Sequence, residues 1–260
     1  MSEGRREDTG QDKLDRSRVK SANRKFYDAI SENYEQVDGR RSDTLKSWLR
    51  QTLEDLRRKA PGGVLLDIGA GGGVVTSCAE GLFDLRVGLD ISQKILAANS
   101  ASFDHGVAAD IDYLPVSDAS VDMVTCFATL HHLYSFDGLS SEIARALKPG
   151  GIFYSDHDMD KAFHDRFKIL LAIYRKINNA KTAYKSVCGD IDDELYDLSE
   201  WGRDGIDSEA LIENLDSLGF SVEPCFHWYG LGRVTDILFG QKARSKQWAP
   251  LVSIRAVKRR

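Results

Sequence analysis

The stretch from Val64 to Thr76, VLLDIGAGGGVVT, decides the fold. It begins with a short apolar run, too short for a buried helix and typical of a strand that is covered on both faces in a parallel sheet. The glycines that follow allow the backbone to turn tightly and to approach a ligand closely. Val74 and Val75 then open an apolar helical pattern. This order of strand, turn and helix points the N–H groups of a helix start at whatever binds there.

The acidic residue of this stretch, Asp67, lies two residues before the first glycine, Gly69. The dinucleotide pattern G-x-G-x-x-G is not met, because residue 74 is Val. A carboxylate here would repel a pyrophosphate and attract an ammonium or sulfonium group. The loop therefore suits the cationic end of an amino acid better than a phosphate. A tight connection without any ligand is the alternative for this segment taken alone.

Composition limits the class of protein. The chain has 260 residues, of which 42% are hydrophobic and 29% charged, which is enough for one substantial domain. We expect no membrane span and no secretory signal, and therefore a cytoplasmic protein. The net charge of −5 disfavours a binder of long nucleic acid, and no oligomeric state is indicated. Four separated cysteines predict packed thiols rather than disulfides or a metal site: Cys78, Cys126, Cys188 and Cys225.

Strands and helices are predicted to alternate, which indicates βαβ units and a parallel sheet. Residues 1–24 are polar and predict a mobile tail before a domain over residues 25–260. Residues 159–206 predict an insertion over the site, a lid or substrate wall, whose first helix carries Phe163, Phe167 and Tyr174 on one apolar face. The predicted strands span residues 64–68, 85–89, 106–109, 121–127, 152–155, 220–228 and 251–257. The predicted helices span residues 26–34, 45–56, 139–147, 161–178 and 211–218.

Polar residues follow several of these strands. Asp90 ends the second strand, 21 residues after Gly69, where nucleotide-binding units place an acid that accepts hydrogen bonds from ribose hydroxyls. A structural turn at Asp90 is the weaker alternative. Asp110 follows the third strand, and a pair of histidines, His131 and His132, follows the fourth. Ligands bind at this edge of such sheets, so these side chains are predicted to share one site.

Four motifs in this order, DIGAGGG, GLDIS, DIDYLPVSDASVD and LKPGG, resemble those of the class I S-adenosylmethionine-dependent methyltransferases. The resemblance covers about residues 26–151 and is greatest to the group with quinone-biosynthesis and many small-molecule methyltransferases. It implies an α/β fold with a Rossmann-like seven-stranded sheet, whose last strand is antiparallel, and helices on both faces. It also implies S-adenosyl-L-methionine as cofactor.

The resemblance further implies roles for individual residues. Asp67, Gly69, Ala70 and Gly71 would line the methionine end of the cofactor. Asp90 would hold the ribose, and Asp110 would accept from the adenine amino group. Ile91 and Ile111 would pack on the two faces of adenine, the backbone near Phe127 and Ala128 would meet the methionine ammonium, and Tyr34 would belong to an aromatic entry helix.

The implied reaction is a direct displacement at a methyl carbon, on an oxygen, nitrogen or carbon of a small or carrier-bound molecule. A base is needed only if the nucleophile loses a proton, and the candidates are His132, His131 and His157. Packing is the alternative role of the double histidine. No stretch typical of adenine, glutamine or cytosine methylation follows the fourth strand.

Two rival functions are a protein that binds S-adenosylmethionine without catalysis and a nicotinamide-dependent oxidoreductase. Asp67 and the missing third glycine of the dinucleotide pattern disfavour the second rival.

Overall fold

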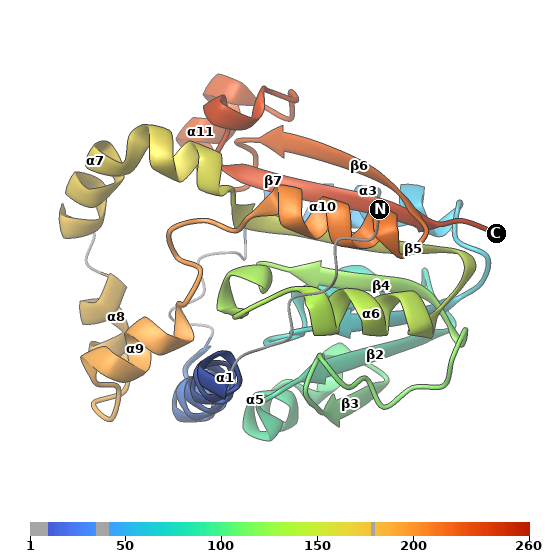
Figure 1. Ribbon diagram of the computed structural model, residues 1–260, viewed down its shortest axis with the longest axis horizontal. Coiled ribbons are helices and arrows are strands. Elements are labelled where there is room, and N and C mark those ends of the chain that lie inside the picture. The colour runs from blue at the N-terminus through green and yellow to red at the C-terminus, as the bar shows by residue number, and fades with distance from the viewer. Residues whose placement is uncertain (1–9, 35–41, 178–179) are drawn as a thin grey trace.

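The computed structural model describes residues 10–34, 42–177 and 180–260. Its centre is a seven-stranded sheet in the order β3-β2-β1-β4-β5-β7-β6 (Figure 1). The strands from β1 to β5 pair in parallel, whereas β7 is antiparallel to both β5 and β6. The predicted sheet, including its antiparallel last strand, is therefore confirmed. The strands are β1 (Val64–Ile68), β2 (Leu85–Asp90), β3 (His105–Ala108), β4 (Val121–Phe127), β5 (Leu147–Met159), β6 (Phe220–His227) and β7 (Leu251–Lys258).

Helices cover both faces of the sheet (Figure 1). The longer ones are α1 (Gly10–Ile30), α3 (Asp43–Arg57), α6 (Asp137–Ala146), α7 (Lys161–Ile177), α8 (Ala180–Val187) and α10 (Ser208–Ser217). The shorter ones are α4 (Val74–Cys78), α5 (Gln93–Ala98), α9 (Asp193–Ser199), α11 (Arg233–Phe239) and the 3-10 turns η1 (Ser100–Ser102), η2 (Leu130–His132) and η3 (Lys246–Trp248).

Alternating residues of the central strands supply the two halves of the core. Leu65 and Met123 pack with α3 and α4 on one face, and Leu66 and Val124 pack with α6 and α10 on the other. Because side chains alternate across a strand, a run that is apolar at every position fits a sheet covered on both sides. All seven residues of β4 are buried.

The N-terminal region differs from the expected tail. Helix α1 begins at Gly10, and its Val19 and Ala22 are buried together with Phe26 and Ile30. These four residues recur at spacings of three and four and form one helical face. The described part of residues 1–24 is therefore part of the folded domain, because a narrow apolar stripe is enough to anchor an otherwise polar helix. Residues 1–9 of that expected tail lie outside the described residues.

The ends of the expected insertion meet at the sheet. Asp160 and Ile206 form an isolated parallel bridge, and the amide of Ile206 donates to the carbonyl of Met159 at 2.8 Å. Within this excursion, α9 packs against α1, and Tyr184 and Tyr196 contact Phe26. The chain between residues 160 and 206 thus leaves the sheet and returns to the same place.

The apolar face predicted for the first helix of this insertion is buried only at its start. Phe163 is buried, whereas Leu170, Tyr174 and Ile177 are exposed. The reason is that α7 extends beyond the sheet edge after a kink at Phe167 (Figure 1). Arg175 in its second half bonds Asp204 and the carbonyl of Arg203, while the apolar side chains named above stay exposed. Among the described residues, no helix is both long and apolar enough to cross a bilayer.

Candidate active site

The glycine turn follows β1 directly and requires glycine at its first position. Gly69 has φ of +69°, a backbone conformation in the left-handed region that side chains disfavour. A Cβ atom there would also lie 2.3 Å from the side chain of Thr129, which follows β4. The turn is therefore held close to the end of β4, so that both strand ends face the same cavity.

Asp90 connects this turn to the end of β2. One carboxylate oxygen accepts from the amide of Gly71 at 3.0 Å, and the other accepts from the amide of Ser92 at 2.9 Å. Burial raises the pKa of Asp90 to about 6, although the backbone donors oppose this rise. The carboxylate is therefore ionised at neutral pH and presents acceptors at the cavity wall.

A cavity of about 100 Å³ lies at the carboxyl ends of β1, β2 and β4. It brings together ten of the eleven residues expected to bind the cofactor and one of the three histidines, His132. The ten are Tyr34, Gly69, Ala70, Gly71, Asp90, Ile91, Asp110, Ile111, Phe127 and Ala128. The sequence motifs thus predicted which strand ends surround one space.

Asp67 does not line this cavity. It is buried within β1, and it accepts a hydrogen bond from the hydroxyl of Thr125 at 2.7 Å. Burial raises its pKa to about 7, the Thr125 hydrogen bond opposes that rise, and the nearby charge of Asp90 adds to it. Asp67 therefore lies behind the glycine turn, where its charge acts on the cavity without direct contact.

Helix α1 forms a wall of the cavity that the sequence motifs did not indicate. Lys20 donates to Asp110 at 2.7 Å and to Asp112 at 2.6 Å, while Asn23 and Tyr27 line the same wall. The sequence contains one indication of this wall. The apolar spacing of the helix predicted over residues 26–34 extends toward the N-terminus as far as Val19. The polar composition of the first 24 residues concealed it.

The chemistry of the residues that line the cavity suits the cofactor that the resemblance implies. The side-chain amide of Asn23 donates to the carbonyls of Val19 and His132, and its buried oxygen has no partner among the described residues. With Asp90 and Asp110, the wall offers acceptors for the ribose hydroxyls and amino groups of S-adenosylmethionine. Ile91 and Ile111 supply apolar surface for the adenine.

His132 is fixed as a neutral ring. Its Nδ1 lies 2.6 Å from the carbonyl of Ser199, so Nδ1 carries the proton, and its Nε2 accepts from the hydroxyl of Tyr27 at 2.7 Å. Burial, together with the charge of the neighbouring His131, lowers the pKa of His132 to about 4. His132 therefore joins α1, η2 and α9, and it is not placed to accept a proton from a substrate.

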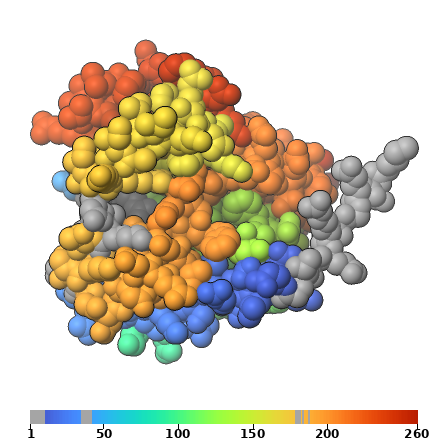
Figure 2. All heavy atoms as spheres, turned by 60° about the vertical axis from the view of Figure 1, so that its left-hand side comes forward, coloured from blue at the N-terminus to red at the C-terminus, as the bar shows by residue number. Residues whose placement is uncertain are grey.

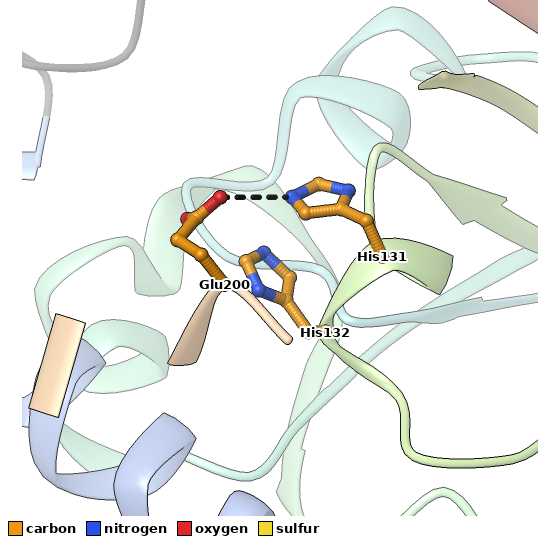
Figure 3. Close-up of side chains that lie close together, drawn as sticks. All are labelled: His131, His132 and Glu200. Carbon is orange, nitrogen blue, oxygen red and sulfur yellow. Dashed lines mark ion pairs between the residues drawn. The ribbon is translucent and has the colours of Figure 1, made fainter. Parts of the chain in front are cut away.

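His131 is held differently, and Figure 3 shows it pointing toward Glu200 above His132. Its Nδ1 lies 2.6 Å from the buried carboxylate of Asp158, which also accepts from the backbone amide of His131 at 3.1 Å. Its Nε2 lies 3.9 Å from Glu200. A carboxylate on Nδ1 orients the ring with Nε2 as the proton acceptor.

The same three side chains are the group among the described residues whose atoms could approach one cation. Ligand atoms of His131, His132 and Glu200 lie within 4.8 Å of one another. A metal ion would compete for His132, because both ring nitrogens of that residue already make hydrogen bonds. The other two members of the group, His131 and Glu200, approach each other at 3.9 Å, and Asp158 already holds Nδ1 of His131.

His157 lies in a second buried cluster at the end of β5. Asp156 accepts from the amide and Nδ1 of His157, from Nε2 of His227 at 2.9 Å and from the hydroxyl of Tyr154 at 2.6 Å. The ring of His157 stacks on Phe127 at 4.4 Å, and Phe127 in turn lines the cavity. His157 itself does not line it.

This cluster predicts a pH dependence of stability. Burial opposes ionisation of both partners, but the charges of His227 and His157 lower the pKa of Asp156 below its usual range, and Asp156 raises the pKa of His227. The contribution of Asp156 is present above its unfolded pKa of about 3.9 and is lost as the pH falls through its folded pKa. The contribution of His227 is present below about 6.5 and is lost as the pH rises through its raised pKa.

We therefore expect His227→Gln to lower the free energy of unfolding by about 1.5–3 kcal/mol at pH 6, the value of a hydrogen bond to a charged group. The loss should become smaller toward pH 9, as the pH rises through the raised pKa of His227. Denaturant unfolding of both proteins at the two pH values measures this difference. The exposed His105→Gln serves as the matched control, and an equal loss at both pH values would contradict the charged pair.

Comparisons with known proteins agree with this geometry. Residues 66–155 match the family model described as a methyltransferase domain. A ubiquinone biosynthesis O-methyltransferase of Thiobacillus denitrificans is 30% identical over 115 residues, covering 41% of this chain and 50% of that protein. The chain thus spans about half the length of the curated relative that it matches.

Two solved structures share the fold over nearly their whole length. A methyltransferase of Thermotoga maritima, described as a possible histamine N-methyltransferase, has a TM-score of 0.60 and 15% identity and covers 91% of this chain and 99% of its own. The magnesium protoporphyrin IX methyltransferase of Synechocystis, solved with bound S-adenosylhomocysteine, has a TM-score of 0.56 and 15% identity. The match covers 92% of this chain and 99% of that protein.

Proposed function

We infer that this chain transfers a methyl group from S-adenosylmethionine to a small molecule. Its central region matches the methyltransferase domain family. Its fold is that of the class I S-adenosylmethionine-dependent methyltransferases. The observation that carries this proposal is the joint placement of the glycine turn, Asp90 and Asp110 around one cavity. We place the reaction in the cytoplasm, on a small or carrier-bound substrate.

In the proposed complex, the bound cofactor supplies a methyl group on a positively charged sulfur. Asp90 accepts from the ribose hydroxyls and at the same time fixes the amide of Gly71, so the position of the ribose and the shape of the turn depend on one carboxylate. Ionised Asp67 behind the turn favours the cationic end of the cofactor. The residues of this wall therefore bind and orient the reactants, which is the main requirement for a displacement with a good leaving group.

We assign the general base, where the substrate nucleophile carries a proton, to His131. Asp158 orients its ring, and Glu200 faces its Nε2 from the end of α9. A hydroxyl or amine bound between His131 and Glu200 would give its proton to Nε2 as the new bond to carbon forms. We assign orientation of the helices, rather than proton transfer, to His132, and to His157 the support of Phe127, on which its ring stacks.

We further propose that residues 159–206 form the substrate side of the site. The carbonyl of Ser199 holds His132, and Glu200 approaches His131, so the end of α9 reaches the two histidines. A segment that leaves and rejoins the sheet at Asp160 and Ile206 is able to move as a unit and to exclude water when it closes.

The proposed function is tested by calorimetry with S-adenosylhomocysteine, followed by turnover against a metabolite panel with release of S-adenosylhomocysteine as readout. Binding and turnover are expected, with phenols and other hydroxyl compounds as the first members of the panel. Binding without turnover of any panel member would favour a binding protein without catalysis. A rise in melting temperature with a nicotinamide dinucleotide alone would favour the oxidoreductase.

The pKa values of the two buried acids predict how cofactor affinity depends on pH. Asp90 titrates at about 6 and Asp67 at about 7, and only their ionised forms favour a bound cation or hydroxyl donor. Affinity for S-adenosylmethionine should therefore rise with pH and level off above about 7. Below the pKa of each acid, that acid should contribute a rise of up to tenfold for each pH unit. Calorimetry from pH 5 to 8 measures this profile. Asp67→Asn should flatten its upper part, and an unchanged profile in that variant would contradict the role of Asp67.

A further inference from the structure

Exposed apolar side chains gather on α7, α11 and η3 at one end of the molecule (Figure 2). On α7, five side chains are 54–75% exposed: Ile169, Leu170, Ile173, Tyr174 and Ile177. Trp248 of η3 is 53% exposed. On and just before α11, four more apolar side chains are 49–76% exposed: Leu231, Val234, Ile237 and Leu238. Such clusters of large apolar side chains mark interaction sites, whereas single exposed ones do not.

Stacked rings join the two helices beneath this surface. Phe163 of α7 contacts Trp228 at 5.4 Å, and Trp228 stacks on Phe239 of α11 at 4.6 Å. Phe167 contacts Trp248 at 5.9 Å. Figure 2 accordingly shows yellow α7 and the red segment near the C-terminus side by side on one end of the molecule. These ring contacts join the start of α7 to α11 and η3, so the exposed apolar residues lie on neighbouring elements at one end of the molecule (Figure 2).

The charges around this surface differ in sign from the rest of the chain. Residues 161–177 and 231–248 together contain nine basic and two acidic residues, a net charge of +7 in a chain whose total is −5. Lys168, Lys176, Arg233, Lys242 and Arg244 are exposed and make no ion pair among the described residues. Arg166 lies over the Trp248 ring at 3.9 Å.

We propose that this surface binds the anionic face of a lipid membrane, with the apolar residues of α7 and α11 inserted among the lipids and the basic residues beside the headgroups. An apolar face flanked by lysine and arginine, with tryptophan and tyrosine at its border, is the pattern of an interfacial protein surface. Basic residues near an anionic leaflet are attracted to it.

Charge also argues against the second occupant, another copy of this chain. Two copies joined through this surface would bring the exposed basic residues of both copies together, which is unfavourable at an interface. An anionic membrane instead neutralises the basic residues and covers the apolar ones. The inference does not rest on methyl transfer, because it uses no residue of the cavity.

The test is flotation of the full chain with phosphatidylcholine vesicles, with and without phosphatidylglycerol. The protein should float only with vesicles that contain phosphatidylglycerol, and added salt should weaken the binding. Ile173→Glu and Ile237→Glu should each weaken it about tenfold or more, from the loss of a buried isoleucine. Lys168→Gln should weaken it about fivefold.

Matched controls are Leu14→Glu, which changes an apolar residue 55% exposed on α1, and Lys94→Gln on α5. Neither should alter flotation, and melting temperatures confirm that each variant folds. The proposal is overturned if the wild type does not float with either vesicle, or if the controls reduce flotation as much as the α7 and α11 variants. It is also overturned if sedimentation shows a dimer that Ile173→Glu converts to a monomer.

Discussion

His131→Gln should lower the turnover number by about 10²–10⁴-fold, the usual contribution of a positioned general base. Glutamine has no group that takes up the proton of the nucleophile. The affinity for S-adenosylhomocysteine should stay within a factor of about two, because His131 does not line the cavity. The measurement is steady-state turnover on the substrate identified from the panel, beside calorimetry with the demethylated product.

Two companion variants separate base catalysis from a general disturbance of the fold. Asp158→Asn keeps the size of the group that orients His131 but weakens its hold on Nδ1, so turnover should fall and the pH profile of kcat should shift. His105→Gln, an exposed substitution on β3, should leave turnover unchanged. If His131→Gln retains wild-type turnover on a hydroxyl substrate, His131 is not the base.

Asp90→Ala should weaken binding of S-adenosylmethionine and of its demethylated product by about 10- to 150-fold, because a hydrogen bond to a charged group is worth roughly 1.5–3 kcal/mol. The substitution also leaves the amides of Gly71 and Ser92 without their acceptor, so the glycine turn loses its support. Calorimetry with both ligands measures the change.

The matched control for this variant is Asp216→Ala, which removes an exposed carboxylate of α10 that bonds Arg259 on the surface. Its cofactor affinity should equal that of the wild type. Circular dichroism verifies that Asp90→Ala is folded before its affinity is interpreted. Unchanged affinity in a folded Asp90→Ala protein would remove this carboxylate from the cofactor site.

The fold was predictable because its determinants are local. The apolar runs of β1 and β4 and the glycine turn each depend on neighbouring residues, and the structure has them at the predicted positions. The alignment of strand ends follows from parallel pairing, which is why Asp90, Asp110 and the residues after β4 could be assigned to one site in advance.

What could not be predicted depends on contacts between distant segments. α1 is polar except for one stripe, and its packing against α9 and α5, with the bonds of Lys20 to Asp110 and Asp112, makes residues 10–24 part of the site wall. The periodicity of α7 indicated an apolar face but not whether the protein or its surroundings would cover it. The different states of His131 and His132, adjacent in sequence, follow from partners 27 and 67 residues away.

The ion pairs of Lys20 have a further consequence for the cofactor. Lys20 already occupies Asp110 and Asp112, where the proposed complex places the amino group of adenine. The protein thus carries its own competitor for the adenine position, at an effective concentration fixed by α1 rather than by the solution. In the proposed complex, the apparent dissociation constant would equal the intrinsic one divided by the fraction of molecules in which this lysine has moved away.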